Sequence, residues 1–205
     1  MFKKFLSALS IASLTAITPS FAEEDKTKGV YFVGAVGIGQ MADIDIHSSD
    51  GGGKMEFDSG FSGDLGIGYD FGTLRTQLTY GSINSDLTKI QGTTVDVGVD
   101  VSSFLLEGAI DFREGKNWQP YVGLGVGSSE ISVNLARTVG NVNLVVGDDN
   151  ITSVIGRVGM SYKASEKVDV YAEGWALAFD DFTIGTVEFY GCGVTGASLG
   201  LRIRL

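Results

Sequence analysis

The sequence predicts an all-β protein, an eight-stranded antiparallel up-and-down barrel that crosses a membrane. Three observations lead to this prediction. Segments of about ten residues alternate between apolar and polar side chains, which is typical of strands with two different faces. Glycine is abundant, with 30 of 205 residues, whereas proline occurs only twice. The connections between the segments alternate between long and short, as they do in barrels that span a bilayer.

The segments 61–71 and 74–80 show the alternation most clearly. Apolar residues take the odd positions of the first segment and the even positions of the second, so both apolar sets share one face across the turn Gly72-Thr73. A two-residue turn that begins with glycine fits a tight hairpin. Strands of about ten residues have the length that crosses a bilayer at a tilt. The predicted register places Phe71 opposite Leu74, Ile67 opposite Leu78, and Asp70 opposite Arg75.

Residues 1–22 have the features of a secretory signal peptide. Lys3 and Lys4 precede an apolar stretch over 5–17, and Ser20-Phe21-Ala22 fits a cleavage site. A membrane anchor is the alternative, but the apolar stretch is short for a full span. We expect cleavage after Ala22, which leaves 23–205 as the barrel domain.

The remaining chain is acidic. Thirteen basic and twenty-five acidic residues give 23–205 a formal net charge of −12. Nucleic acid is therefore not an expected partner, since phosphate binding needs clustered Lys and Arg. Cys192 is the only cysteine, so no disulfide can form within the chain.

Six further segments complete the predicted barrel. The one that ends at Phe112 changes phase, because the valines at 95–101 stand on the opposite parity from Phe104 and Leu106. This change predicts a β-bulge near Val101. The six segments cover about 29–39, 102–112, 120–127, 154–163, 168–173 and 195–205.

The four long connections are predicted to lie at one end of the barrel and the three short ones at the other. Long connections on the outside and short periplasmic turns are the pattern of outer-membrane barrels. The long connections are predicted at 41–59, 82–96, 129–150 and 180–193.

These features resemble those of the small outer-membrane barrel proteins of diderm bacteria, the opacity-like and OmpA-transmembrane-like families, which are often labelled porin-like. The resemblance rests on the signal peptide, the eight alternating segments, the run Tyr121-Val122-Gly123-Leu124-Gly125 and the closing amphipathic strand. It implies an outer-membrane location, insertion by the barrel assembly machinery, contact with membrane lipid and no cofactor. Such barrels usually end in Phe or Trp, whereas this chain ends in Leu205.

A soluble barrel of the lipocalin type would place the apolar face inside. Glycine is concentrated on the polar face instead, which favours a polar and narrow lumen where side chains are crowded. Aromatic residues near the strand ends suit a membrane girdle. The glycines are Gly66, Gly68, Gly123, Gly125, Gly127 and Gly200, and the aromatic residues are Tyr69, Phe71, Tyr80, Phe112 and Tyr162.

An eight-stranded barrel is only wide enough for its own side chains, so we expect a filled lumen without an open pore. A turn centred near Ser165 would place Arg157 opposite Glu173, Val158 opposite Ala172, and Tyr162 opposite Val168. Buried charges are tolerated when paired, which predicts a structural charge network in the lumen. Its predicted members are Arg157, Glu173, Glu107, Arg202, Arg75 and Asp70.

No residues are assigned to a catalytic, metal or cofactor site. His47 with Ser85 and Asp86 is the one candidate relay for a lipid acyltransferase, which a transfer assay on wild type and His47→Ala would test. Asp148-Asp149-Asn150 and Asp180-Asp181 offer oxygen ligands to a divalent cation, but no spacing matches a known cation loop.

We therefore expect a monomeric, non-enzymatic barrel with a structural or surface-interaction role, whose four long acidic connections are available to a surface ligand. The first alternative is a small porin-like channel. The second is a lipid-modifying enzyme.

Overall fold

The computed structural model describes residues 28–42, 44–46, 53–90, 93–112, 117–135, 142–145, 151–180, 182–184, 187–189 and 193–205. The predicted signal peptide at 1–22 lies outside these residues. The same holds for His47, Asp148, Asp149, Asn150, Asp181 and Cys192.

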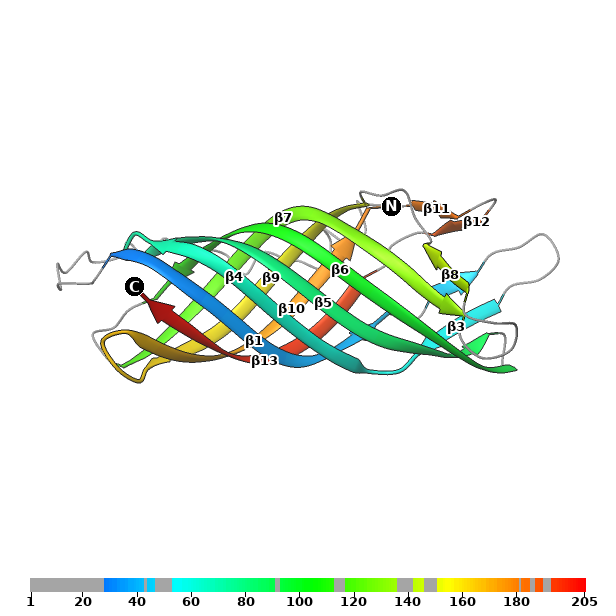
Figure 1. Cartoon of the computed structure of the whole chain (residues 1–205), viewed down its shortest axis with the longest axis horizontal. Coiled ribbons are helices and arrows are strands. Elements are labelled where there is room, and N and C mark those ends of the chain that lie inside the picture. The colour runs from blue at the N-terminus through cyan, green and yellow to red at the C-terminus, as the bar shows by residue number, and fades with distance from the viewer. Residues whose placement is uncertain are drawn as a thin grey trace, which may run out of the picture.

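Eight long strands form one closed barrel (Figure 1). Each pairs antiparallel with its neighbours along the chain, and the last strand pairs with the first over eleven residue pairs, so no edge of this barrel remains open. The predicted fold class is thereby confirmed. The strands are β1 (Gly29–Met41), β4 (Gly60–Asp70), β5 (Leu74–Ile90), β6 (Thr93–Asp111), β7 (Trp118–Leu135), β9 (Ile151–Lys163), β10 (Val168–Phe179) and β13 (Gly193–Arg204).

Short strands extend the structure at the end of the long connections, on the right of Figure 1. There β3 (Gly53–Phe57) pairs with β2 (Ile44–Ile46) and with β5, while β8 (Val142–Val145) pairs with β7. A separate hairpin joins β11 (Phe182–Ile184) to β12 (Val187–Phe189).

The predicted connection at 82–96 is wrong. Strands β5 and β6 continue through it and remain paired up to Ile90 and Thr93. Strand β7 likewise runs to Leu135, well into the connection predicted from 129. The polar residues of 82–96 suggested a loop, but polar residues also suit the outer face of a strand in water.

The first hairpin has the predicted register, with Ile67 opposite Leu78 and Asp70 opposite Arg75. Gly72 has a φ of 111°, a backbone conformation that favours glycine. Its N–H donates to Asp70 Oδ1 at 2.7 Å, and the N–H of Phe71 donates to the Leu74 carbonyl at 2.9 Å. The turn is therefore closed by both backbone and side-chain bonds.

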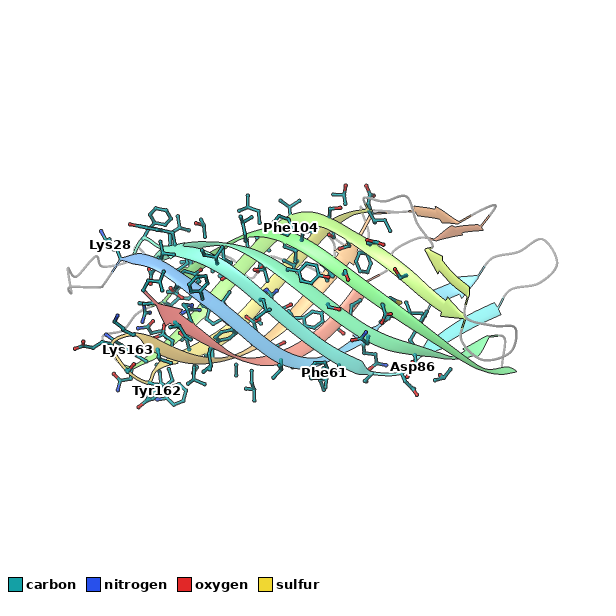
Figure 2. The ribbon with its side chains drawn as sticks, in the orientation of Figure 1. Lys28, Phe61, Asp86, Phe104, Tyr162 and Lys163 are labelled. Carbon is teal, nitrogen blue, oxygen red and sulfur yellow. The ribbon has the colours of Figure 1, made fainter. Side chains whose placement is uncertain are left out.

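The outer face of the barrel is an apolar belt, shown by the side chains in Figure 2. At the short-turn end, Trp118 stacks near Tyr162 with 4.8 Å between ring centroids, and Tyr69 lies 4.6 Å from Phe71. Of the predicted girdle, Tyr69, Phe71, Phe112 and Tyr162 lie at this end, and Trp118 adds to them. Tyr80 is not at a strand end, because β5 continues to Ile90. The belt includes Phe32, Val36, Ile38, Phe61, Leu65, Ile67, Leu78, Phe104, Leu106, Leu124, Val158, Leu199 and Leu201.

The predicted bulge near Val101 is also wrong. Strand β6 pairs with both neighbours through Val101 without a shift in register, and the irregularity between β5 and β6 lies between Leu87 and Lys89. Val101 is 1% exposed and faces the lumen. The phase change in the sequence has another cause. From Phe104 toward the long connections, the outer face of β6 becomes polar and its inner face becomes apolar.

The inner face at the long-connection end is filled by an apolar plug. Its side chains come from β3 and from every barrel strand except β4, and all of them are buried. A barrel wall surrounded by water needs such a core, whereas a wall surrounded by lipid does not. The plug consists of Met41, Phe57, Ile83, Val99, Val101, Leu105, Ile131, Ile151, Ile155, Trp175, Leu177, Phe179 and Val194.

Closure predicts resistance to detergent. With every barrel strand paired on both sides, unfolding needs the loss of whole strand pairs at once. The folded protein should migrate differently on a denaturing gel before and after boiling, with a chain kept in urea as the unfolded reference. Identical migration of all samples would contradict a closed barrel.

Candidate functional site

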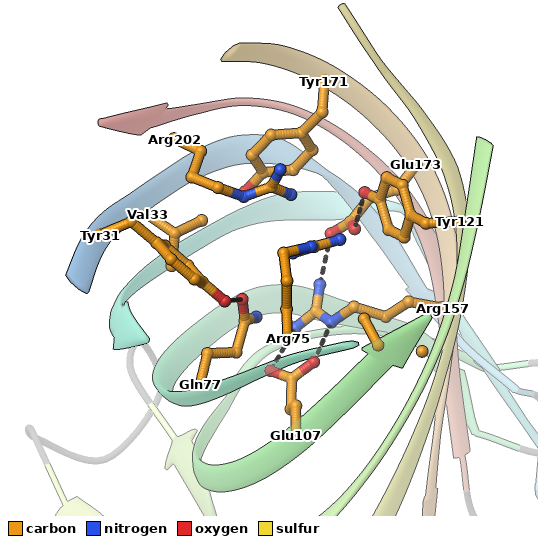
Figure 3. A pocket seen from close by; sticks show the side chains of 12 residues that line it. Tyr31, Val33, Arg75, Gln77, Glu107, Tyr121, Arg157, Tyr171, Glu173 and Arg202 are labelled. Carbon is orange, nitrogen blue, oxygen red and sulfur yellow. Dashed lines mark hydrogen bonds and ion pairs between the residues drawn. The ribbon is translucent and has the colours of Figure 1, made fainter. Parts of the chain in front are cut away.

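The lumen below the apolar plug holds a group of ion pairs that we call the central cluster, made of Asp64, Glu107, Arg157 and Glu173. Arg157 from β9 contacts all three carboxylates. Its Nε donates to Glu107 Oε2 at 2.7 Å, and its NH1 nitrogen donates to Glu173 Oε1 at 2.5 Å and to Asp64 Oδ2 at 3.1 Å. One guanidinium group thus joins β4, β6 and β10 across the barrel, and Figure 3 shows its bonds to Glu107 and Glu173.

Glycine and tyrosine complete this cluster. The Glu107 side chain crosses β7 above Gly125, where an added Cβ would lie 2.6 Å from Glu107 Cγ. Tyr121 of β7 donates its hydroxyl to Glu173 Oε2 at 2.6 Å. Gly125 therefore leaves room for the Glu107 carboxylate to reach Arg157, which lies two strands away.

The predicted register between β9 and β10 is wrong by two residues. Arg157 faces Trp175, and Glu173 faces Gly159. Val158 accordingly faces Gly174 rather than Ala172, and Tyr162 faces Val170 rather than Val168. Lys163 pairs with Asp169, so the turn is centred on 166 and not on 165. Arg157 still contacts Glu173, because its long side chain reaches the diagonal neighbour.

A second group, the basal cluster, lies toward the short turns. Arg75 forms a two-pronged pair with Asp111, at 2.7 Å from Nε and 3.0 Å from the NH2 nitrogen. Asp169 accepts from Arg202 at 3.2 Å and from Arg204 at 2.5 and 3.0 Å. Arg204 Nε also lies 3.8 Å from Asp70. The basal cluster is thus Asp70, Arg75, Asp111, Asp169, Arg202 and Arg204.

The six residues predicted from the sequence all point into the lumen, but they divide between the two clusters. Arg157, Glu173 and Glu107 meet in the central cluster. Arg75, Asp70 and Arg202 belong to the basal cluster, and Arg75 takes Asp111 as its partner although Asp70 faces it in the register. The prediction missed Asp64, Asp111, Asp169 and Arg204, which share the inward parity of their strands.

Three tyrosine rings lie between the clusters. The Arg202 guanidinium lies 5.4 Å from the ring centroid of Tyr31 and 5.6 Å from that of Tyr171. Arg75 lies 5.0 Å from the centroid of Tyr121. Cation–π contacts of this kind stabilise a guanidinium group that has lost its hydration.

Each of these tyrosines lies over a glycine on the neighbouring strand. Tyr31 faces Gly68, Tyr121 faces Gly159, and Tyr171 faces Gly200. A Cβ added at Gly68 would lie 2.4 Å from Tyr31 Cζ, and the values at the other two glycines are similar. Glycine on the polar face therefore makes room for aromatic rings, which fits the crowding predicted for a narrow lumen.

Only a small space remains between the two clusters. It has a volume of about 20 Å³ and is lined by side chains that include Arg75, Arg202, Tyr171 and Glu107 (Figure 3). A cavity needs roughly 10–15 Å³ to hold one water molecule. Ion pairs and tyrosine rings of the described residues lie around this space, and the apolar plug lies toward the long connections.

The candidate acyltransferase relay does not converge in the described part of the chain. Ser85 is 4% exposed and donates its hydroxyl to the Asp58 carbonyl at 2.6 Å. Asp86 is exposed on the opposite face of β5, since neighbouring side chains of a strand alternate. Within the described residues, no three His, Cys, Asp or Glu side chains are placed to hold a metal ion.

The fold and its filled lumen define a class, the small β-barrels of the outer membrane. Residues 6–194 match the family model of the outer membrane protein β-barrel domain, and the chain belongs to this family. The family places the protein in a bacterial outer membrane. No curated protein matches the chain in sequence.

Several solved structures share the fold. Neisserial surface protein A is 20% identical with a TM-score of 0.62, and the match covers 86% of this chain and 97% of that one. The outer membrane protein OprG from Pseudomonas aeruginosa is 16% identical with a TM-score of 0.56, covering 88% and 99%. The outer membrane protein AlkL is 14% identical with a TM-score of 0.53, covering 90% and 95%.

Proposed function

We propose that this protein is a non-enzymatic outer-membrane barrel with a sealed lumen, and that it acts through its extended external end. The observation that supports this most is the filling of the lumen. The apolar plug occupies one end and two ion-pair clusters the other, with room for about one water molecule between them. A diffusion path for solutes would need most of these side chains to move.

The external end supports a role in surface interaction. Strands β5, β6 and β7 have 17, 19 and 18 residues, which is longer than a bilayer needs. Their outer faces become polar between Tyr80 or Phe104 and the long connections. Exposed acidic side chains there include Asp86 and Glu130. The apolar plug behind this wall makes it a rigid base for the long connections. We propose that a surface ligand binds this end of the barrel, at the connections within 41–59, 136–150 and 180–193 and at the paired ends of β5 and β6.

The name of Neisserial surface protein A describes a surface protein with the same fold. A surface role is proposed here for this chain as well, together with delivery through the secretory signal at 1–22 and insertion by the barrel assembly machinery.

Conductance tests the sealed lumen. The refolded protein is expected to give no stepwise current in planar lipid bilayers, because the described side chains of the plug and of the two clusters fill the lumen. A large porin refolded in the same way serves as the positive control. Discrete openings that scale with the amount of protein inserted would support the porin-like channel instead.

Proteolysis tests the orientation. Lys163 and Lys167 flank the exposed short turn between β9 and β10. Trypsin added to intact cells should leave this turn uncut and should cut it once the outer membrane is made permeable. Cleavage there on intact cells would invert the proposed orientation and place the long connections in the periplasm.

A further inference from the structure

Among the described residues, two buried side-chain atoms lack a partner, Ser62 Oγ and Arg202 Nε, and the second belongs to a charged group. The Arg202 side chain is 2% exposed, and its NH1 nitrogen donates to Asp169 at 3.2 Å. The rings of Tyr31 and Tyr171 lie near its guanidinium group. Its Nε–H, however, has no acceptor among the described residues. A buried donor on a charged group is costly to leave unpaired, because its hydration is lost without replacement.

The small cavity between the clusters borders this side chain. Arg202 is one of its lining residues, together with Tyr31, Tyr171 and Gln77. Its volume of about 20 Å³ is sufficient for one water molecule and leaves no room for a second layer. The residue that carries the unpaired donor therefore lines a space that could hold an acceptor.

We propose that this cavity binds one ordered water molecule, which accepts a hydrogen bond from Arg202 Nε and links the basal cluster to the central cluster. A buried water needs about two to four polar partners. The lining supplies them in Arg75, Gln77, Glu107 and Glu173, in addition to Arg202.

The charges of the lumen favour water over a small anion. Six carboxylates share the two clusters with the four guanidinium groups of Arg75, Arg157, Arg202 and Arg204. An anion would add to this negative excess and would face Glu107 and Glu173. Water accepts from a guanidinium and donates to a carboxylate, so it suits a lining that carries both.

The surroundings also predict slow exchange of this water. The apolar plug blocks the path toward the long connections. The pairs that Asp169 forms with Arg202 and Arg204 block the path toward the short turns. The water would leave only when one of these groups moves.

A high-resolution crystal structure grown with bromide in place of chloride tests the identity of the ligand. We expect a density peak within about 2.7–3.2 Å of Arg202 Nε, the range of N–H···O bonds, without anomalous scattering at the bromide edge. An anomalous peak would mean a halide, and an empty cavity would mean no ligand. Either result overturns the proposal.

A solution measurement uses two matched substitutions. Gly123 lines the cavity, and a Cβ added there would lie 3.4 Å or more from the nearest atoms, so Gly123→Ala fills space without a clash. Gly156→Ala adds the same methyl group outside the cavity, with the nearest atom at 3.8 Å. Neither residue belongs to the ion-pair clusters.

Nuclear magnetic resonance of the refolded protein should show cross-relaxation between Arg202 Hε and a long-lived water in wild type and in Gly156→Ala. The signal should be lost in Gly123→Ala. Its absence from wild type, or its persistence in Gly123→Ala at wild-type strength, would overturn the proposal. If Gly123→Ala does not fold, Ala109→Val fills the same cavity from β6.

Discussion

Arg157→Ala is expected to lower the free energy of unfolding of the refolded barrel by about 3–5 kcal/mol, the usual cost of removing one member of a buried ion pair. Arg157 is the cation that contacts Asp64, Glu107 and Glu173. Without it, three carboxylates lie close together in a lumen closed by apolar side chains. Urea-induced unfolding in lipid vesicles measures the loss, and Lys163→Ala, an exposed cation on the same strand, is the control.

Glu173→Ala should cost less, because Arg157 keeps Glu107 and Asp64 as partners. The double variant should lose less than the two single losses together, with a coupling of about 0.5–3 kcal/mol. Strictly additive losses would mean that the two side chains do not interact in the bilayer. The lumen would then be hydrated, and each of its charges would contribute little to stability.

Gly68→Ala is expected to destabilise the barrel by about 1–3 kcal/mol, the usual cost of overpacking a filled core. The new Cβ would lie 2.4 Å from Tyr31 Cζ and 2.4 Å from the Thr76 carbonyl oxygen. Tyr31 is fully buried, and its hydroxyl donates to Gln77 Oε1 at 3.1 Å, so the ring cannot move away freely.

Gly63→Ala is the matched control for this substitution. It makes the same change on β4, but the added methyl group points toward lipid. The atom nearest to this group, the Ala35 carbonyl oxygen, lies at 3.8 Å. The urea midpoint of Gly68→Ala should therefore be lower than that of Gly63→Ala, by the amount that corresponds to the full packing cost. Equal midpoints would show that Tyr31 repacks and that glycine is not needed beneath the ring.

The inversion of polarity along β5, β6 and β7 follows from the two solvents that surround the barrel. Within the apolar belt the outer face meets lipid, and the polar side chains turn inward and pair with each other. Above the belt the outer face meets water, and the apolar side chains turn inward and form the plug. One strand therefore carries both alternation patterns without a change in its backbone register.

The sequence by itself determined the number of barrel strands, the two faces of the segments that alternate clearly, and the register of the hairpin at Gly72-Thr73. These properties depend on a period of two residues and on a two-residue turn, which are local. It also identified all six predicted lumen charges as inward-facing, because inward and outward positions alternate along each strand.

Only the tertiary structure decided which charges pair. Arg157 takes Glu107 from a strand that is not its neighbour, and Arg75 takes Asp111 in place of the residue opposite it on β4. Such partners depend on barrel closure and on the glycines that leave space between strands, which alternation does not encode. The register at the 164–167 turn was mispredicted because a longer turn does not define its own centre. The course of β6 through Val101 was mispredicted because a change of solvent along a strand gives the same order of residues as a bulge.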